Sequence, residues 1–239
     1  PEQYAFIIND DGSMAVFHSI RNEEKAGFVK WTTNGRYHSV VAIDDRVFVA
    51  TVRNLGSGTN SYVLEELKTT SRLDCSKTYT ATSSNNGIFT TSTPFANGAS
   101  LAVLEGNNFI GTFTMANNQI NVSAIKLINT AEIGFSFTSS LKTLPVDASV
   151  AGGPLTGEPR AITRVNLDLI STLSVSVNAI PLIIQGVTDT VTNDEMAFNP
   201  FTGKKEFRLL GYSRDPRVEI TQTAPLDLQI NGMIVEVAF

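Results

Sequence analysis

The chain has 239 residues, of which 42% are hydrophobic and 17% are charged, and its formal net charge is −5 at pH 7. This acidic balance argues against a nucleic-acid reader, because such proteins use Lys and Arg to displace the counterions of the phosphates. The single cysteine, Cys75, excludes an internal disulfide framework and fits assembly in a reducing cytoplasm.

The first 70 residues predict short strands joined by tight turns. The chain begins at Pro1 with no signal-like region, which fits either removal of an initiator methionine or a fragment of a longer protein. Turn-forming residues, including Asp-Gly and Asn-Gly pairs that tolerate positive φ, cluster at 9–12, 33–35 and 44–45. The best helical candidate, residues 21–28, is too short for more than a turn or two. Residues 46–52 are apolar on both faces and predict a central strand that is packed on two sides.

A polar stretch at residues 68–76 follows and marks the first predicted domain boundary. From there to residue 145, apolar runs are separated by turn sequences at 84–87, 105–108 and 116–118. Short strands at this spacing are typical of a sandwich or a barrel.

The second predicted boundary is residues 146–159, whose Gly and Pro content indicates a long loop or linker. Residues 189–205 are expected to form an exposed excursion from the last domain. The longest fully apolar run, 179–184, is too short to cross a bilayer, so we expect no membrane insertion.

Apolar and polar residues alternate at 164–170, 174–178 and 226–230, which predicts strands with one buried and one solvated face. A turn is expected at residues 231–232, an Asn-Gly pair. Helical periodicity is not sustained along the sequence. The chain is therefore predicted to be all-β, with domains at 1–70, 71–145 and 146–239.

The two histidines, His18 and His38, both fall within strand patterns. Serine–histidine catalysis needs an imidazole within hydrogen-bond reach of the nucleophile. Ser39 adjoins His38, but neighbouring residues on a strand point to opposite faces. No G-x-S-x-G motif is present. We interpret both histidines as strand-face residues.

Metal and carboxylate chemistry has little support in the sequence. Two histidines and one cysteine, widely separated, do not make a zinc site. Residues 9–13 concentrate oxygen ligands but lack the downstream glutamate of a calcium loop, so a turn is expected, with a weak calcium site as the alternative. Carboxylates at 22–24, 64–67 and 193–196 are candidates for glycoside hydrolysis, but the sequence does not place any two at the required separation. We expect no catalytic residue, metal or cofactor.

Three aromatic residues near loops, Tyr212, Phe198 and Phe201, have two interpretations. They are candidates for a sugar-binding platform, and they are equally candidates for packing anchors or subunit contacts. The sequence does not distinguish these two interpretations, and we take core or interface packing as the expectation.

The region 4–53 carries an Asp-Gly hairpin and then the stretch KAGFVKWTTNGRYHSV. This region resembles the last propeller-like segment of the tail nozzle proteins (tubular tail protein B, or phage stabilisation proteins) of short-tailed bacteriophages. The matching residues are Asp11, Gly12, Glu24, Gly27, Trp31, Thr33 and Gly35. Phe28 stands where the family often has a tryptophan, and Asn34 forms the turn with Gly35.

The resemblance continues in the same order along the chain. The similar segments are 71–80, 94–122, 131–147 and 209–239. The family residues kept within them include Leu104, Glu105, Gly106, Arg214, Asp215, Pro225 and Glu236. The departures are Tyr212, where the family usually has tryptophan, and Asp227, where it has a second proline.

The resemblance implies a non-enzymatic structural protein of the virion, present here as a fragment of the nozzle. Its fold would be a propeller-edge antiparallel segment followed by two β-sandwich-like or barrel-like domains. Copies would assemble in the host cytoplasm, typically as a ring of six, in contact with the tail adaptor and the tail fibre proteins. The phage DNA would leave through this ring without specific binding.

Two other functions stay open at this point. One is a module that binds host-surface glycan or another receptor through loop aromatics. The other is a polysaccharide-degrading tail enzyme that uses paired carboxylates.

Overall fold

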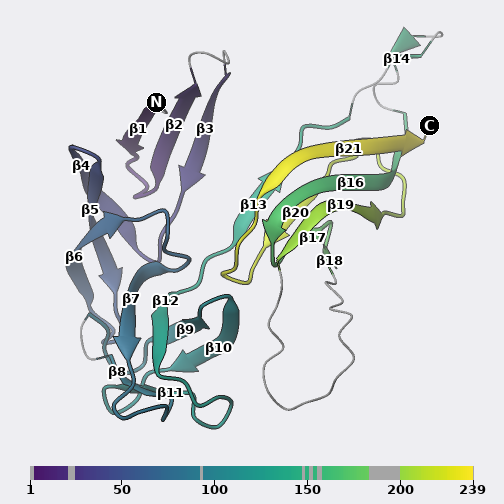
Figure 1. The fold of residues 1–239 in the computed structure, drawn as a ribbon. Helices are drawn as coiled ribbons and strands as arrows, with labels where there is room; N and C mark the ends of the chain where they lie inside the picture. The colour runs from purple at the N-terminus through teal and green to yellow at the C-terminus, as the bar shows by residue number, and fades with distance from the viewer. Residues whose placement is uncertain are drawn as a thin grey trace. The chain divides into compact units, whose positions relative to one another are not determined.

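The computed structural model describes residues 3–20, 25–91, 94–146, 149–150, 153–154, 158–182 and 200–238. The regular elements in these ranges are all strands, so the chain is all-β with several antiparallel sheets, as predicted (Figure 1). It divides into two compact units, Pro1–Gly106 with Ile110–Ser136, and Asn107–Phe109 with Phe137–Phe239. The predicted domain limits at 70 and 145, and the propeller-edge character of the first segment, stay predictions.

A three-stranded sheet opens the first unit, with the order β1-β2-β3. Its strands are β1 (Gln3–Ile8), β2 (Met14–Ile20) and β3 (Lys25–Trp31). The predicted turn at 9–12 joins β1 to β2, with Gly12 at a φ of 81°. Residues 25–28, predicted to be helical, instead begin β3, where Phe28 pairs with Phe17. The helical prediction is wrong there because cross-strand aromatic packing outweighs a weak local preference; residues 21–24 lie outside the described residues.

The second sheet of this unit has the order β4-β5-β6. Its strands are β4 (Arg36–Ile43), β5 (Arg46–Asn54) and β6 (Asn60–Leu67). The predicted turns at 33–35 and 44–45 precede and follow β4. The prediction that 46–52 form a central strand is confirmed, but two-sided packing is not: Val49 and Thr51 are buried, whereas Phe48 and Val52 on the opposite face are only half-buried.

The rest of the first unit encloses one apolar core. A four-stranded sheet in the order β10-β9-β12-β7 and a two-stranded sheet, β11-β8, contribute to it. Their strands are β7 (Asp74–Thr80), β8 (Ile88–Thr90), β9 (Ser100–Glu105), β10 (Asn108–Thr114), β11 (Gln119–Asn121) and β12 (Thr130–Phe135). Fully buried Phe89, Ile120, Leu101 and Ile133 from both sheets share the core. The predicted turns at 84–87, 105–108 and 116–118 lie between these strands.

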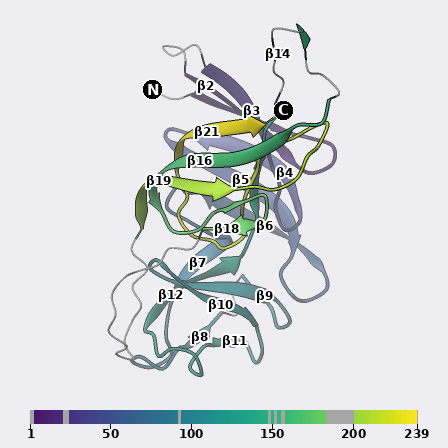
Figure 2. The same ribbon diagram turned by 90° about the vertical axis from the view of Figure 1, so that its right-hand side faces the viewer.

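The second unit is built mainly from two further sheets, β19-β16-β21 and β13-β20-β17-β18. Figure 2 shows the strands of the first of these side by side. The strands are β13 (Ser139–Lys142), β16 (Ala161–Thr172), β17 (Ser176–Val177), β18 (Ile180–Pro181), β19 (Phe201–Arg208), β20 (Glu219–Gln222) and β21 (Ile230–Ala238). Val165, Leu167 and Leu169 of β16 are fully buried, which confirms the alternation predicted for 164–170. Within the predicted linker, β14 (Ser149–Val150) pairs with β15 (Gly153–Pro154).

Three predictions for this unit are wrong at least in part. Residues 226–229 form no strand, because they lie opposite the irregular end of β16. Ser171 there has a φ of 45°, and the carbonyls of Gln229 and Asp227 accept hydrogen bonds from Ile170 and Leu173 outside a regular ladder. The pair 231–232 is no turn: it lies in β21, at a register shift opposite Asp168. Residues 201–205, predicted to belong to an excursion, pair with β16 as part of β19; residues 189–199 lie outside the described residues.

Candidate functional site

A buried arginine links two sheets of the first unit, since Arg53 of β5 binds Asp74 of β7. The alternation along β5 puts Arg53 on the same face as Val49 and Thr51, and its side chain is fully buried. Its Nη1 and Nη2 donate to Oδ2 and Oδ1 of Asp74, at 2.9 and 3.2 Å. Its Nη2 also donates to Glu65 Oε2 at 2.6 Å, and its Nε donates to Thr51 Oγ1 at 3.1 Å. We call Arg53, Glu65 and Asp74 the arginine hub.

The hub also holds the connection between β3 and β4. Asp74 Oδ2 accepts hydrogen bonds from Thr33 Oγ1 at 2.7 Å and from the backbone N–H of Asn34 at 3.2 Å. Gly35, with a φ of 139°, lies so close to β5 that a Cβ atom would stand 2.3 Å from the carbonyl oxygen of Val52. The Asn34-Gly35 turn predicted from the sequence is therefore bonded to Asp74 of the hub and packed tightly against β5.

The electrostatics of the hub disfavour a reactive nucleophile. Burial is the largest single effect and acts to lower the pKa of Arg53, but the hydrogen bonds to Asp74 and the negative charges of Asp74 and Glu65 together outweigh it and hold this pKa above its ordinary value. Burial raises the pKa of the Cys75 thiol well above its usual range, and the neighbouring Glu65 adds to the effect. Burial also raises the pKa of Tyr37 to about 12. Cys75 and Tyr37 therefore stay protonated at neutral pH and are poor nucleophiles.

Several residues singled out by the resemblance serve turns in the first unit. Lys30 Nζ lies 2.8 Å from Asp11 Oδ2, and this bond, with those from Ser13, lowers the pKa of Asp11. The carbonyl of Gly12 accepts a hydrogen bond from the backbone N–H of Tyr37 at 2.8 Å. Glu105 Oε2 binds Lys126 Nζ at 2.6 Å, and the carbonyl of Gly106 accepts from Arg72 Nη1 at 2.7 Å.

The aromatic residues of β3 do not form a closed core. The rings of Phe28 and Phe17 are 4.7 Å apart, and those of Trp31 and Phe6 are 6.3 Å apart. Phe28 nevertheless stays 69% exposed and Trp31 37% exposed. The two rings lie on opposite faces of the sheet, since Phe28 pairs with Phe17 and Trp31 pairs with Met14. On each face a further layer of protein can contact the exposed ring.

Apolar side chains are also exposed on the β4-β5-β6 sheet. In the register of the strands, they occupy the face opposite Arg53. The most exposed are Val41, Ile43, Tyr62 and Leu64, which we call the outer face. Tyr62 and Leu64 are 76% and 73% exposed. Adjacent apolar residues that lack cover are typical of interaction surfaces rather than of monomer surfaces.

The two histidines lie on strand faces beside tyrosines. The ring of His18 stacks on Tyr4 at 4.5 Å, and that of His38 meets Tyr62 edge-on at 5.7 Å. In the described part of the chain, no group of three or more His, Cys, Asp or Glu residues is placed to hold a metal ion. The carboxylates of 64–67 do not act as a pair, since Glu65 binds Arg53 and Glu66 binds Arg46; those of 22–24 and 193–196 lie outside the described residues.

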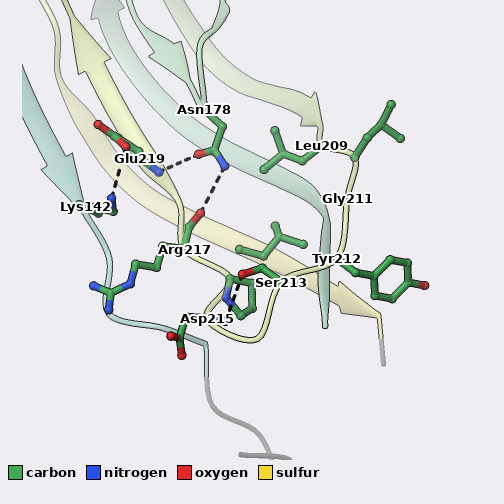
Figure 3. A pocket seen from close by; sticks show the side chains of 12 residues that line it. Lys142, Asn178, Leu209, Gly211, Tyr212, Ser213, Asp215, Arg217 and Glu219 are labelled. Atoms are coloured by element: carbon green, nitrogen blue, oxygen red, sulfur yellow. Dashed lines mark hydrogen bonds and ion pairs between the residues drawn. The ribbon is translucent and has the colours of Figure 1, made fainter. Parts of the chain in front are cut away.

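The second unit contains an open pocket of about 510 Å³ (Figure 3). It is lined by Lys142, Ile162, Asn178, Pro216, Arg217, Glu219 and residues 209–213 and 215. Lys142 Nζ lies 3.7 Å from Glu219 Oε2, and the amide of Asn178 is bonded to backbone atoms of Arg217 and Glu219. The ring of Tyr212, which is 68% exposed, points away from the side chains of Arg217 and Asp215. The polar groups therefore do not converge on one point.

A second buried arginine anchors the loop that carries this pocket. Arg160 is 3% exposed. Its Nη2 donates to the carbonyl of Arg214 at 3.0 Å and its Nη1 to that of Val146 at 2.6 Å.

The other predicted residues of this unit are not gathered at one site. Pro225 is buried elsewhere in the same unit, while the carboxylate of Asp215 is exposed. Of the predicted aromatic platform, Phe201 packs half-buried against the core, Tyr212 is exposed, and Phe198 lies outside the described residues.

Replacing Arg160 with methionine should destabilise the second unit. The carbonyls of Val146 and Arg214 would lose a charged donor in a buried setting, which costs about 1–3 kcal/mol. Urea unfolding followed by near-ultraviolet circular dichroism measures the loss. Arg164→Met, at an exposed position on β16, is the control and should change stability much less. Equal effects of the two substitutions would contradict the anchoring role.

Comparison with known proteins leaves the family open. A scan against protein-family models found no match, and neither did a search of the curated proteins. No helix in the described ranges is long and apolar enough to span a membrane.

Proposed function

We propose that the chain is a structural component of a bacteriophage tail, part of the nozzle ring through which the genome leaves, and that it has no enzymatic role. The ordered series of motifs from Asp11-Gly12 to Pro225 carries this proposal. The proposal also includes assembly of identical copies, contact with the tail adaptor and tail fibre proteins, and a location in the virion.

The charge of the chain supports a passage for DNA. A channel lined with Lys and Arg would hold the polymer through its phosphates. The net charge of −5 instead lets a polyanion pass without lasting contacts. The clustered cations of a DNA-binding groove are not found in the sequence, and the two buried arginines each bind groups of the protein itself.

The exposed apolar faces support assembly. A ring of identical copies needs two different surfaces on each copy, so that each contact is heterologous and the ring closes. The outer face and the face of the first sheet that carries Phe28 and Phe17 are two distinct apolar surfaces on one unit. Burying both in subunit contacts would remove apolar area from water and cover the free edge of β3.

Placing a charge on the outer face should prevent assembly without unfolding the chain. We expect the double substitution Tyr62→Lys, Leu64→Lys in the full-length protein to abolish ring formation, because two ammonium groups would be buried in the contact. Light scattering measures the assembly, and the melting temperature should stay close to that of the wild type, since both side chains are exposed.

The matched control is Thr112→Lys, which adds a charge at an exposed strand position of β10, away from the outer face. It should assemble normally. Assembly of the double variant with the same stoichiometry as the control would remove the outer face from the proposal.

Glycan binding is the second candidate, favoured by the exposed Tyr212 ring at the edge of the pocket. Aromatic rings beside polar pockets are suited to the apolar faces of sugars, although here the ring points away from the polar side chains. Glycan arrays and sugar-soaked crystals distinguish the two: a sugar seated on Tyr212 favours this candidate, and the absence of binding leaves the structural role.

A further inference from the structure

The arginine hub contains one cation and two carboxyl groups. Arg53 is fully buried, and the side chains of Glu65 and Asp74 are only 17% and 20% exposed. With both carboxyl groups ionised, the hub would carry one uncompensated negative charge in a site with little water. Such a charge is costly unless it is hydrogen-bonded on all sides.

The two carboxyl groups differ in the hydrogen bonds that stabilise their negative charge. Asp74 accepts from Arg53 through both oxygens and also from Thr33 and Asn34. Glu65 accepts from Arg53 through Oε2, whereas its Oε1 is buried and has no regular hydrogen bond among the described residues. The groups beside this carboxyl are the Cys75 thiol, which is a weak donor, and the Thr51 hydroxyl, which also faces the carbonyl of Val63.

The charged and titratable groups that surround Glu65 come from three strands. They are Arg53 of β5, Asp74 and Cys75 of β7, and Tyr37 of β4. Arg53 favours the ionised form of Glu65, and the negative charge of Asp74 opposes it. Burial is the largest effect and raises the pKa of Glu65 above its ordinary value.

We propose that the arginine hub is a proton-responsive clamp, in which Glu65 takes up a proton as the pH falls and the protonated hub holds β6 to β7 and to the β3–β4 turn more tightly. The proton neutralises the surplus charge and leaves Arg53 and Asp74 as a matched pair. Loss of the proton restores the surplus negative charge and weakens the attachment of β6 to β7 and to the β3–β4 turn. This inference does not depend on the proposed role in a phage tail.

The direction of the pH dependence follows from linkage. The closed hub binds the proton more strongly than an open hub, in which Glu65 is solvated with a pKa near 4.5. Between that value and the raised pKa of the closed hub, each unit of rising pH should favour opening by about tenfold. Above the raised pKa the equilibrium should become flat. The clamp is therefore tight at the acid end of this range.

Direct titration of the carboxyl carbons by NMR tests the proposal on the unaltered chain. Glu66 is the internal control, since it is adjacent in sequence, faces the other side of the sheet and has its pKa lowered by Arg46. We expect the midpoint of Glu65 to lie above that of Glu66. A midpoint at or below that of Glu66 would overturn the proposal.

Hydrogen exchange between pH 5 and pH 8 tests the clamp itself. After correction for intrinsic rates, the amides of Arg53 and Asp74 should exchange faster at the alkaline end in the wild type. In Glu65→Gln, a neutral side chain of the same shape, this added pH dependence should disappear, whereas Glu66→Gln should retain it. A pH dependence that is equal in all three proteins, or a Glu65→Gln chain that does not fold at pH 5, would contradict a protonated hub.

Discussion

Replacing Arg53 with methionine is expected to lower the free energy of unfolding of the first unit by about 3–5 kcal/mol. The substitution keeps much of the volume of the side chain but removes the cation shared by Asp74 and Glu65. Both carboxyl groups would then be largely buried without a cation beside them, and Asp74, left with its hydrogen bonds from Thr33 and Asn34, would hold the β3–β4 turn less firmly. Urea unfolding with tryptophan fluorescence reports this loss, because Trp31 is the only tryptophan and lies just before that turn.

The matched control for this change is Arg46→Met on the same strand. Arg46 pairs with Glu66 at 2.8 Å, but both lie on the partly solvated outer side of the sheet. Exposed pairs contribute little, so this substitution should have a much smaller effect. If both variants lost the same small amount of stability, the ion pairs of the arginine hub would not be what stabilises the first unit.

Replacing Gly35 with alanine is expected to lower the free energy of unfolding of the first unit by about 2–4 kcal/mol. Part of the cost is backbone strain, because Gly35 has a φ of 139°, a conformation that alanine rarely adopts. The rest is steric, since the added Cβ would stand 2.3 Å from the Val52 carbonyl oxygen and 2.6 Å from the Cβ of Arg53. Thermal and urea unfolding of the purified variant measure the sum.

Gly58→Ala separates the two contributions. Gly58 also has a positive φ, 80°, but nothing lies within 4 Å of where its Cβ would be. This control should show strain without a clash. Because a φ of 139° is less accessible to alanine than a φ of 80°, the difference between the two variants is an upper bound on the cost of the clash against β5. A Gly35→Ala chain no less stable than Gly58→Ala would mean that the turn is not held against the hub.

Local sequence signals predicted the features that depend on neighbouring residues. The turns at 9–12 and 33–35 follow from Asp-Gly and Asn-Gly pairs, whose preference for positive φ is a property of the residues themselves. The burial of Val165, Leu167 and Leu169 follows from simple alternation. Neither inference needs knowledge of a distant partner.

Features that depend on distant partners were missed or misjudged. The Asn-Gly pair at 231–232 became a bulge because β21 must match β16, some sixty residues earlier in the sequence. Arg53 finds its partners Glu65 and Asp74 on other strands, 12 and 21 residues away. A signal for Arg53 was present, since it continues the buried alternation of Val49 and Thr51, but a charged residue at such a position was not recognised as a hub. Arg160 carried no comparable signal.

The most direct test of the central claim is a mass measurement, with low-resolution imaging, of the full-length protein alone and mixed with a tail adaptor ring, which is the partner that the proposal names. The structural proposal predicts closed rings of identical copies that dock coaxially on the adaptor. Monomers that never join the adaptor or a tail would contradict it.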